Sequence, residues 1–297
     1  MDELNEIHPL VSIILPTYNR AELLGRAISS VILQDYKNWE LMIVDNYSHD
    51  GTDAVVENFK DSRIRLLKIQ NDGVIGKSRN HGIRNSTGQW LAFLDSDDWW
   101  LPSKLSICIA ECGNSTDLLY HDLAISKNGK ILKWNKISGW ALNKPVINDL
   151  LLKGNAIANS TVMVRREIIE RIGYISEDIN INPSVDYNTW LKVARVTNSF
   201  KYIPKVLGVY LIHAGGVSQR DMSISHNFAI ADFLGVLTKF ELESVHNQVN
   251  YIHGRYLYES KNYASAEAAL KKCMLPYDLN IFIKSIISII LIKLKTL

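Results

Sequence analysis

The stretch FLDSDDWW places three carboxylates within four positions, at Asp95, Asp97 and Asp98. Like charges at this spacing repel one another, so the cluster needs a positive partner. The usual partner of clustered carboxylates is a hard cation that prefers oxygen ligands, such as Mg2+ or Mn2+. Such a cation keeps open positions that phosphate oxygens can fill. The D-x-D formed by Asp95 and Asp97 therefore predicts a site for a divalent metal and a nucleotide diphosphate.

The surroundings of the D-x-D favour this site over a more ordinary role. A lone D-x-D is more often a solvated turn or a helix cap. Here it follows the apolar run WLAFLD at 90–95 and precedes Trp99 and Trp100, and Pro102 suits the start of a helix. A position between a strand and a helix favours the metal and phosphate site. The two tryptophans fit core packing, or stacking on a sugar ring.

The elements that position these acids alternate along the first third of the chain. Continuous apolar runs predict strands at 11–16, 40–45, 64–69 and 90–95, with three helices between them, the last at about 75–86. Asn19 and Glu22 have the spacing of a capping box that opens the first helix. Strands that are apolar throughout are typical of a parallel sheet covered by helices on both faces. The predicted class is therefore α/β.

The carboxyl ends of these strands are where a ligand is expected. In an open α/β sheet the ligand lies beyond the carboxyl ends of the strands. Asp45 ends the second predicted strand and Asp95 the fourth, so we expect both at one rim, with Asp97 and Asp98 in the loop just past it. For Asp45 alone, an Asx turn that ends the strand is an equally good interpretation.

Three ordered motifs resemble the nucleotide-binding half of glycosyltransferase family 2, whose members have the GT-A fold. They are VSIILPTYNRAELLGRAISSVILQDYKNWELMIVDNYSHDGT, NDGVIGKSRNHGI and GQWLAFLDSDDWWLPSKL. The resemblance is close over about 10–125 and looser to about 220. It implies a Rossmann-like, mainly parallel sheet flanked by helices. It also implies an inverting transferase that uses a nucleotide-diphospho-sugar, usually a UDP-sugar, and Mn2+ or Mg2+.

The resemblance assigns roles to residues within these motifs. Asp97 matches the direct metal ligand of the family's D-x-D, and Asp95 matches a contact to the ribose or to the metal and its water. Asp45 resembles the aspartate that bonds the base. The other residues that would flank the nucleotide are Pro16, Tyr18, Asn19, Gly76, Lys77, Arg79, Asn80 and Ser96. The fork of Arg79 suits phosphate or base oxygens, although a solvated helix face is the ordinary alternative.

The second half of the chain has to supply a base for the acceptor. A sugar hydroxyl is a poor nucleophile, and a carboxylate that takes its proton speeds transfer by about 10^2 to 10^4. SVDYNTWLKVARV at 184–196 predicts a helix and resembles the family stretch in which an aspartate before an aromatic residue is this base. That residue would be Asp186. The family often has an acid where Val185 stands, and a helix cap is the plain alternative. Asp178 is the second candidate.

A histidine after the predicted acceptor-side helix is a third metal candidate. VLGVYLIHAGGVSQ at 206–219 predicts the end of a strand followed by a glycine pair. It resembles the late family segment in which a histidine approaches the metal or diphosphate and a loop closes over the donor. His213 would be this residue, with Gly215 and Gly216 as the hinge. A structural histidine and a simple turn are the alternatives.

The remaining segments predict the organisation of the chain. Asn128-Gly129 between two apolar runs is a strong hairpin signal, and the pattern becomes helical from about 223. We expect a GT-A catalytic domain at 1–220, with a nucleotide-binding half at about 10–125 and an acceptor half at about 126–220. A C-terminal helical region at 221–297 would be its appendage.

The last segment, IFIKSIISIILIKLKTL, is apolar but interrupted by lysines. About 20 unbroken apolar residues are needed to span a bilayer, so we do not expect it to cross. On a helical wheel Lys284, Ser285, Ser288 and Lys295 share a narrow face opposite a broad Ile/Leu face. A helix at 279–297 that lies on a membrane surface and a helix that packs on protein explain this pattern equally well.

Bulk composition excludes several classes of protein. The 33 basic and 31 acidic residues give a formal net charge of +2 without a basic block, so no nucleic-acid partner is expected. Three cysteines without a CxxC, and an acidic N-terminus without an apolar signal core, predict a cytoplasmic protein. No G-x-G-x-x-G follows the first strand, which argues against a dinucleotide dehydrogenase. PTYNRAE also lacks the glycine-rich, basic loop expected of a nucleotidyltransferase.

Together with these features, the resemblance to glycosyltransferase family 2 implies an inverting, metal-dependent hexosyltransferase. We expect it to move a sugar from a UDP-hexose, such as UDP-glucose or UDP-galactose, to a saccharide linked to a polyprenyl diphosphate. The product would be a β linkage in O-antigen or other polysaccharide synthesis, made at the cytoplasmic face of the inner membrane. A non-catalytic nucleotide-sugar binding module, or an assembly partner, would keep the D-x-D but would not need Asp186. The sequence leaves the oligomeric state open.

Overall fold

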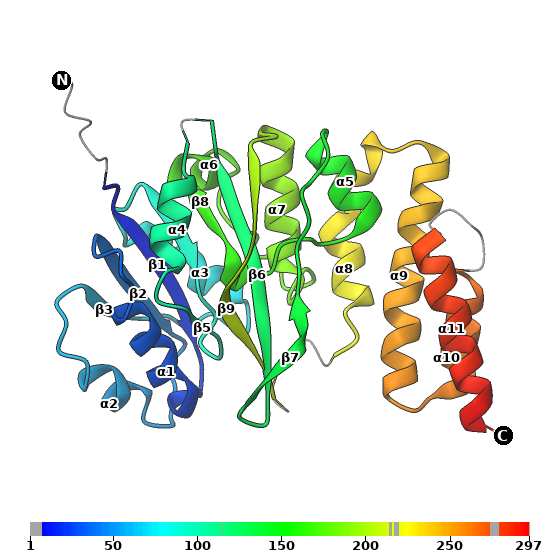
Figure 1. Cartoon of the computed structure of the whole chain (residues 1–297), viewed down its shortest axis with the longest axis horizontal. Coiled ribbons are helices and arrows are strands. Elements are labelled where there is room, and N and C mark those ends of the chain that lie inside the picture. Colours follow the sequence, from blue (N-terminus) through cyan, green and yellow to red (C-terminus); the bar gives the residue numbers. More distant parts are fainter. Residues whose placement is uncertain (1–7, 114, 214–215, 217–219, 274–278, 297) are drawn as a thin grey trace.

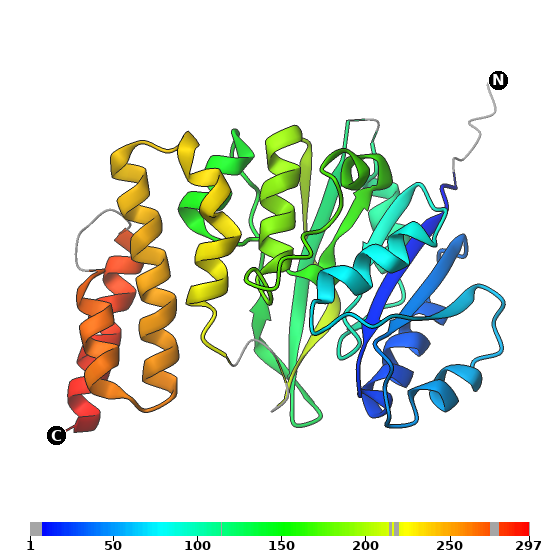
Figure 2. The same cartoon turned by 180° about the vertical axis from the view of Figure 1, so that it is seen from behind.

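The computed structural model describes residues 8–113, 115–213, 216, 220–273 and 279–296. Within these residues, one mixed sheet of nine strands forms the centre of the molecule. Helices cover both faces of the sheet, and the C-terminal helices lie at the end of the molecule opposite its N-terminal strands (Figures 1 and 2). The predicted α/β class with C-terminal helices is confirmed.

The first part of the chain alternates between strands and helices. Its elements are β1 (Val11–Thr17), α1 (Ala21–Ile32), β2 (Trp39–Asp45), α2 (Thr52–Glu57), β3 (Ile64–Lys68), α3 (Ile75–Arg84) and β4 (Trp90–Phe93). β1 pairs in parallel with β2 and β4, and β2 pairs in parallel with β3. All four strands therefore end at the same edge of the sheet, as predicted.

These strands are apolar throughout because both of their faces are buried. In β1, Ile13 and Leu15 belong to a core shared with Leu24 of α1, whereas Ile14 belongs to a second core with Ile83 of α3. Successive side chains of a strand point to opposite faces, so one strand contributes to two cores. Full burial of such a side chain stabilises the fold by about 1.5–3 kcal/mol. This packing fixes the edge of the sheet where the acids lie.

The second part of the chain extends the same sheet with mixed pairing. Its elements are β5 (Trp99–Trp100), α4 (Lys104–Glu111), β6 (Leu118–Lys127), β7 (Lys130–Ile137), α5 (Val146–Lys153), the 3-10 helix η1 (Asn159–Thr161), β8 (Met163–Arg165), α6 (Arg166–Arg171), α7 (Val185–Val196) and β9 (Phe200–Ile212). The sheet order is β3-β2-β1-β4-β8-β6-β9-β5, with β7 paired to β6. β8 runs antiparallel to β4 and β6, and β6 runs parallel to β9.

The predicted hairpin and the predicted acceptor-side helix are both present. Asn128 and Gly129 have φ values of 51° and 74°, which are the left-handed values that a tight two-residue turn between β6 and β7 requires. α7 begins at Val185 and buries Trp190 and Leu191, as its pattern predicts. The turn and the helix are local features, and their residue types are sufficient to predict them.

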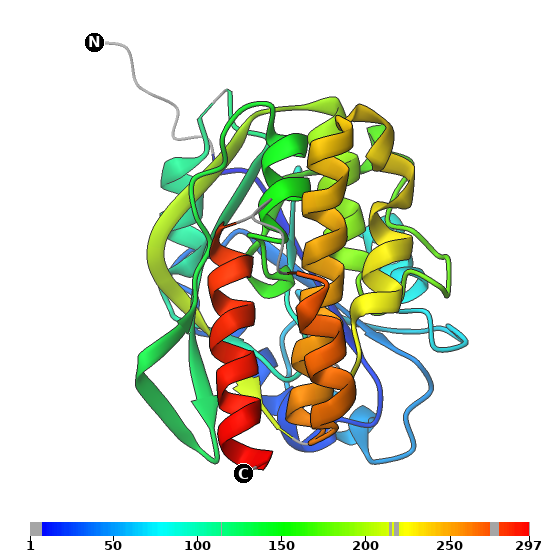
Figure 3. The ribbon, with the colours of Figure 1, turned by 90° about the vertical axis from the view of Figure 1, so that its right-hand side faces the viewer.

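The C-terminal helices pack partly on the sheet domain and partly on each other. They are α8 (Ser223–Ile230), the 3-10 helix η3 (Ala231–Val236), α9 (Lys239–Glu259), α10 (Tyr263–Lys271) and α11 (Leu279–Thr296). Ile230 and Val245 share a core with Trp190 of α7, while α10 and α11 pack against α9 (Figure 3). α8 and α9 thus share a hydrophobic core with the preceding region. The predicted domain boundary near residue 220 stays a prediction.

α11 packs with the two serines of its predicted polar face turned inward, whereas Lys284 and Lys295 of that face are exposed. Ser285 and Ser288 are buried against the neighbouring helices, together with Ile292. Small side chains on this face let the helix axes approach closely. Among the described residues, no helix combines the length and the apolar character that a membrane crossing needs.

The first turn of α3 docks directly on the segment before α7. A Cβ at Gly76 would lie 2.0 Å from the backbone oxygen of Ser176, so only glycine allows this approach. Asn80, one turn later, donates from Nδ2 to the Ile175 oxygen (2.9 Å) and accepts from the Ile175 nitrogen (3.1 Å). These contacts connect the nucleotide half of the sheet domain to the segment that leads to Asp186.

Substituting Gly76 with alanine should therefore destabilise the fold. The added methyl group has to push apart two backbone segments, and overpacking of this kind costs about 1–3 kcal/mol. Gly25→Ala is a matched control, because a Cβ there meets only Val55 Cγ1 at 3.7 Å, an ordinary contact. It should leave stability unchanged or raise it by up to about 1 kcal/mol. Urea unfolding of both variants tests this, and a Gly76→Ala protein as stable as wild type would contradict it.

Candidate active site

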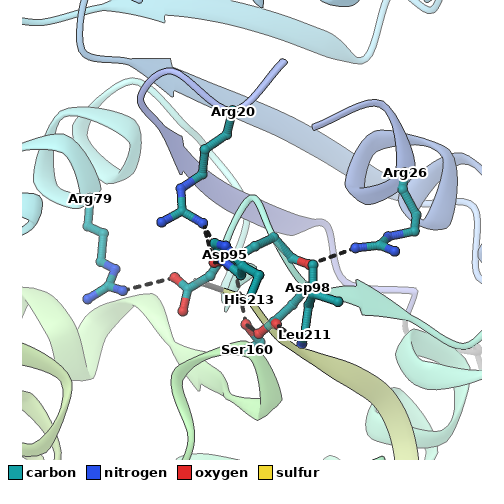
Figure 4. A network of polar contacts seen from close by, with 9 residues as sticks. Arg20, Arg26, Arg79, Asp95, Asp98, Ser160, Leu211 and His213 are labelled. Atoms are coloured by element: carbon teal, nitrogen blue, oxygen red, sulfur yellow. Dashed lines mark hydrogen bonds and ion pairs between the residues drawn. The ribbon is translucent and has the colours of Figure 1, made fainter. Parts of the chain in front are cut away.

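The D-x-D loop lies at the carboxyl edge of the sheet, as predicted. Asp95 follows β4, and Asp97 and Asp98 lead into β5. Three arginines from other parts of the chain surround this loop (Figure 4). They are Arg20 in the loop after β1, Arg26 in α1 and Arg79 in α3. The positive charge near the acids therefore comes from the protein itself.

Oδ2 of Asp97 lies at the centre of this cluster. Arg20 forms an ion pair with it through Nη1, and Nε2 of His213 lies 2.9 Å from the same oxygen. Nη1 of Arg20 is also 2.9 Å from Nε2 of His213. Arg26 donates from Nη2 to the backbone oxygen of Asp97 at 3.1 Å and stacks on the ring of Trp99. The predicted metal candidates Asp97 and His213 are thus brought together.

Asp95 has a separate set of partners. Its Oδ1 accepts from Nη2 of Arg79 at 3.0 Å and from Nδ2 of Asn159 at 2.8 Å. Its backbone nitrogen donates to Oγ of Ser160 at 3.1 Å. Arg79 is almost fully buried, so its charge is held in place beside Asp95 rather than on a solvated helix face.

Asp98 is buried and holds the loop to two other elements. Oγ of Ser160 donates to it at 2.6 Å, and the backbone nitrogen of Leu211 donates at 3.2 Å. Burial, and then the charges of Asp97 and Asp95, raise the pKa of Asp98 well above its usual range. A carboxyl group in this state has a structural role, and Trp100, whose Nε1 donates to the Ser160 oxygen, is part of the same core.

Asp45 is fully buried at the end of β2 and accepts three hydrogen bonds. Ser48 donates from its backbone nitrogen (3.0 Å) and from Oγ, and Nζ of Lys68 donates at 2.7 Å. Ser48 lies three residues after Asp45, whereas an Asx turn bonds the nitrogen two residues on, so these contacts are not the Asx turn of the alternative interpretation. A base-binding role for Asp45 stays a prediction.

Asn19 does not form the predicted capping box, and that prediction is wrong. α1 begins after Arg20 without a side-chain cap. Asn19 instead accepts from the His49 nitrogen at 2.9 Å through Oδ1, and its own nitrogen donates to Oγ of Ser48 at 2.8 Å. The loops after β1 and β2 are therefore tied to each other, and this tie uses the polar atoms that a cap would have needed.

The other predicted nucleotide contacts lie around the same edge. Pro16 is buried in β1, Tyr18 is half exposed just after that strand, and Ser96 is buried within the D-x-D loop. Lys77 lies in the first turn of α3 and pairs with Asp72 at 2.8 Å, and Gly76 serves the backbone contact described above. Their nucleotide contacts stay predictions.

Asp186 lies in the first turn of α7, close to the D-x-D cluster. Its Oδ1 accepts from the Tyr187 nitrogen at 2.7 Å, and Nδ2 of Asn155 is 3.5 Å from Oδ2. Removal from water raises the pKa of Asp186 to about 6, an effect that the nearby charge of Arg79 opposes and that of Asp95 reinforces. The carboxylate keeps partial exposure. A group with this pKa can accept a proton near neutral pH.

Asp178, the second candidate for the base, has different surroundings. It accepts from the backbone nitrogen and from Nδ2 of Asn180, both at 2.9 Å, in an exposed turn. The preceding Glu177 accepts from Nδ2 of Asn80 at 2.8 Å. The geometry therefore favours Asp186 over Asp178.

Four residues of the cluster were not among the predicted site residues: Arg20, Arg26, Asn159 and Ser160. Arg20 directly follows the motif PTYN, so its place in the sequence was a usable signal. Asn159 and Ser160 belong to NSTVMVR, whose apolar residues suit a strand, whereas its first three residues form η1. Gly215, part of the predicted hinge, lies outside the described residues, and the nitrogen of Gly216 donates to the His213 oxygen at 3.0 Å.

Asp97 and His213 fit a divalent cation. Adjacent ligands of an octahedral cation with bonds of about 2.1 Å lie about 3 Å apart, and Oδ2 of Asp97 is 2.9 Å from Nε2 of His213. Nη1 of Arg20 touches both atoms, so a positive group already lies between them. Across the part of the chain that the structure describes, no three His, Cys, Asp or Glu side chains gather into a complete metal cluster. A cation here would need oxygens from a phosphate or from water.

Comparison with known sequences places these residues in a family context. A family model described as glycosyl transferase family 2 matches residues 12–173, more than half of the chain. The Escherichia coli protein WfgD, named as UDP-Glc:alpha-D-GlcNAc-diphosphoundecaprenol beta-1,3-glucosyltransferase, is 30% identical over 251 residues, which are 82% of this chain and 92% of WfgD. WfaP, an E. coli protein with the same activity in its name, is 32% identical over 212 residues, covering 70% and 80% of the two chains.

Comparison with solved structures supports the fold. Staphylococcus aureus TarS 1-349 in complex with UDP-GlcNAc matches with a TM-score of 0.62 and 19% identity, over 93% of this chain and 79% of that chain. The mannosyltransferase PcManGT from Pyrobaculum calidifontis, in complex with GDP-Man and Mn2+, matches with a TM-score of 0.60 and 20% identity, over 95% and 86%. At this identity the likeness concerns the fold alone, which is GT-A-like as predicted.

Proposed function

The chain belongs to glycosyltransferase family 2, and from this membership we propose that it transfers a hexose from a UDP-hexose to a saccharide acceptor with inversion. The observation that carries the proposal is the position of Asp186. A partly exposed carboxylate with a pKa of about 6 lies within electrostatic reach of Asp95 and Arg79 at the D-x-D edge. A non-catalytic nucleotide-sugar binding module would not need a carboxylate with a raised pKa at this position.

The nucleotide would lie along the carboxyl ends of β1, β2 and β4. Asp45 and the loops tied by Asn19 would hold the base and ribose, while Arg79 would contact the diphosphate, beside Asp95. Pro16, Tyr18, Gly76, Lys77 and Ser96 would line this path. UDP-glucose is our first candidate for the donor, because both named E. coli relatives use UDP-Glc, and UDP-galactose is the second.

We propose Mn2+ or Mg2+ as the metal, held by Asp97 and His213, with Asp95 nearby. Bound there, such a cation would stabilise the negative charge on the leaving nucleotide diphosphate. Arg79, which pairs with Asp95, would add to this stabilisation, because a fixed positive group costs little reorganisation at the moment of transfer.

Asp186 would act as the general base for the acceptor. Its carboxylate takes the proton of the acceptor hydroxyl while that oxygen bonds to C1 of the sugar, and the C1–phosphate bond breaks on the opposite side. An α-linked donor then gives a β-linked product. The Tyr187 nitrogen donates to one carboxylate oxygen, which limits the rotation of the group.

The acceptor we propose is a saccharide linked to a polyprenyl diphosphate. The two E. coli relatives are named for an acceptor of this kind, an alpha-D-GlcNAc-diphosphoundecaprenol. Such a lipid is confined to a membrane, so the enzyme would work peripherally at the cytoplasmic face of the inner membrane, in the assembly of O-antigen or a related polysaccharide.

A donor panel tests the proposed function. Wild type is assayed with UDP-, GDP- and dTDP-sugars and a GlcNAc-diphospho-lipid acceptor, with Mn2+, Mg2+ or EDTA. We expect one UDP-hexose to be transferred, with loss of activity in EDTA. Asp186→Asn should lower transfer by about 10^2 to 10^4, while its Kd for UDP stays within about threefold. Asp178→Asn is the matched control and should remain active. Binding without turnover in wild type would favour the non-catalytic module instead.

The pH dependence of transfer should report the base. Asp186 must be deprotonated to act, and its raised pKa of about 6 means that protonation removes activity as the pH falls through that value. We expect kcat/KM to be constant above this pH and to fall tenfold per pH unit well below it. Asp178→Asn should keep the same profile. An acid limb at pH 4 or lower would show that Asp186 is not the titrating base.

Removing the charge of Arg20 should strengthen the binding of free metal. Arg20 contacts the same atoms of Asp97 and His213 that would hold the cation, so the two compete. An ion pair at this exposure is worth up to about 1 kcal/mol, so Arg20→Gln should raise the Mn2+ affinity about fivefold without nucleotide. Electron paramagnetic resonance of free Mn2+ measures this directly. Arg26→Gln should change the Mn2+ affinity less, because Arg26 bonds the backbone oxygen of Asp97 and not its carboxylate. Unchanged or weaker Mn2+ binding by Arg20→Gln would contradict the competition.

A further inference from the structure

α11 exposes apolar side chains to solvent while it buries serines. Ser285 and Ser288 are 0% and 3% exposed, and they face α9 and α10. Five large apolar residues on the other side are each at least 40% exposed: Ile283, Ile287, Ile290, Leu291 and Leu294. We call these five residues the outer face of α11. A helix that served only to complete the domain would bury this side, because exposed Ile and Leu gain nothing from water.

We propose that the outer face of α11 docks on an anionic bilayer, with the helix lying in the plane of the membrane surface. The inference rests on the proposed function only in its choice of acceptor, because a lipid-linked acceptor would be found at such a surface. Its structural basis is independent of catalysis. An amphipathic helix of this type inserts its apolar face between lipid headgroups and acyl chains.

The charges on α11 favour a bilayer over a second copy of the chain. The helix has no acidic residue, and Lys284 and Lys293 are exposed on either side of the outer face. Two copies that paired through this face would bring their lysines together with no acid on either helix to balance them. Anionic lipid headgroups supply that balance. Lys295, by contrast, lies over the rings of Tyr258 and Tyr263 and helps to hold α11 on the domain.

A second exposed element lies on the same side of the molecule. β7 carries Trp134, which is 94% exposed, and Ile131, which is 57% exposed, with Lys130 and Lys133 beside them. β7 and α11 are both on the side that faces the viewer in Figure 1, and Figure 3 shows the two on the same flank. Tryptophan and lysine are the residues that favour a membrane–water interface. We therefore include Trp134 of β7 as a second contact in the proposed docking.

Vesicle flotation with the full chain tests the proposal. Wild type is mixed with vesicles of phosphatidylcholine and phosphatidylglycerol, and with vesicles of phosphatidylcholine alone. The test variant carries Ile287→Glu and Leu294→Glu, two exposed positions where a charge does not disturb the core. The matched control is Leu33→Glu, because Leu33 is 65% exposed and Leu294 66%, and Leu33 lies at the end of α1. Circular dichroism and transfer to a water-soluble acceptor analogue check that each variant is folded.

We expect wild type and Leu33→Glu to float with the anionic vesicles, and much less with the neutral ones. The double variant should lose at least about tenfold in vesicle affinity while its transfer to the soluble analogue stays unchanged. Trp134→Ser should cause a smaller loss. Absence of wild-type flotation, or equal flotation of the double variant, would overturn the docking proposal. It would also be overturned if wild type and Leu33→Glu were dimers in solution and the double variant were a monomer. Sugar transfer is measured separately, so the flotation results do not decide whether the proposed function is correct.

Discussion

The site depends on how the charge of three neighbouring carboxylates is balanced. The structure uses two physical solutions for Asp95, Asp97 and Asp98. Asp97 and Asp95 form ion pairs with Arg20 and Arg79 respectively. Asp98 is buried, and its raised pKa favours the neutral form. Because Arg20 comes from the loop after β1 and Arg79 from α3, the acids can gather only when the sheet and its helices are in place.

Asp98 and Ser160 connect the two halves of the sheet domain at this point. Asp98 accepts from Ser160 in η1 and from Leu211 in β9. Asn159, next to Ser160, reaches Asp95, and His213, two residues after Leu211, reaches Asp97. The buried carboxyl group of Asp98 thus sets the positions of Asn159 and His213, which contact the two carboxylates of the D-x-D. Gly76 performs a similar task for the segment before α7 by allowing backbone contact with Ser176.

The features that the sequence predicted correctly are those determined by local patterns. Apolar runs placed the strands of the α/β sheet, Asn128-Gly129 placed the hairpin, and the pattern of SVDYNTWLKVARV placed α7. The partners of polar atoms were harder to predict, because they lie far away in the sequence. Asn19 could cap α1 or bond His49 thirty residues later, and only the packing of β1 beside β2 favours the second.

The orientation of α11 could not be predicted from the sequence either, because the helices that it contacts are not identified by its own pattern. A helical wheel identifies a serine face and an isoleucine face, but it does not say which of them meets the rest of the protein. In the structure α9 and α10 take the serine face, and the apolar face is exposed. The arrangement becomes reasonable when the helix has two different surroundings, protein on one side and a lipid surface on the other.

The most direct test of this account is a crystal structure with Mn2+ and UDP, in which anomalous scattering locates the metal. The account predicts a manganese peak within bonding distance of Oδ2 of Asp97 and Nε2 of His213, completed by diphosphate oxygens. It also predicts that the guanidinium of Arg20 leaves its place between those atoms. A manganese ion that contacts neither residue, or an Arg20–Asp97 ion pair that persists with the metal bound, would contradict it.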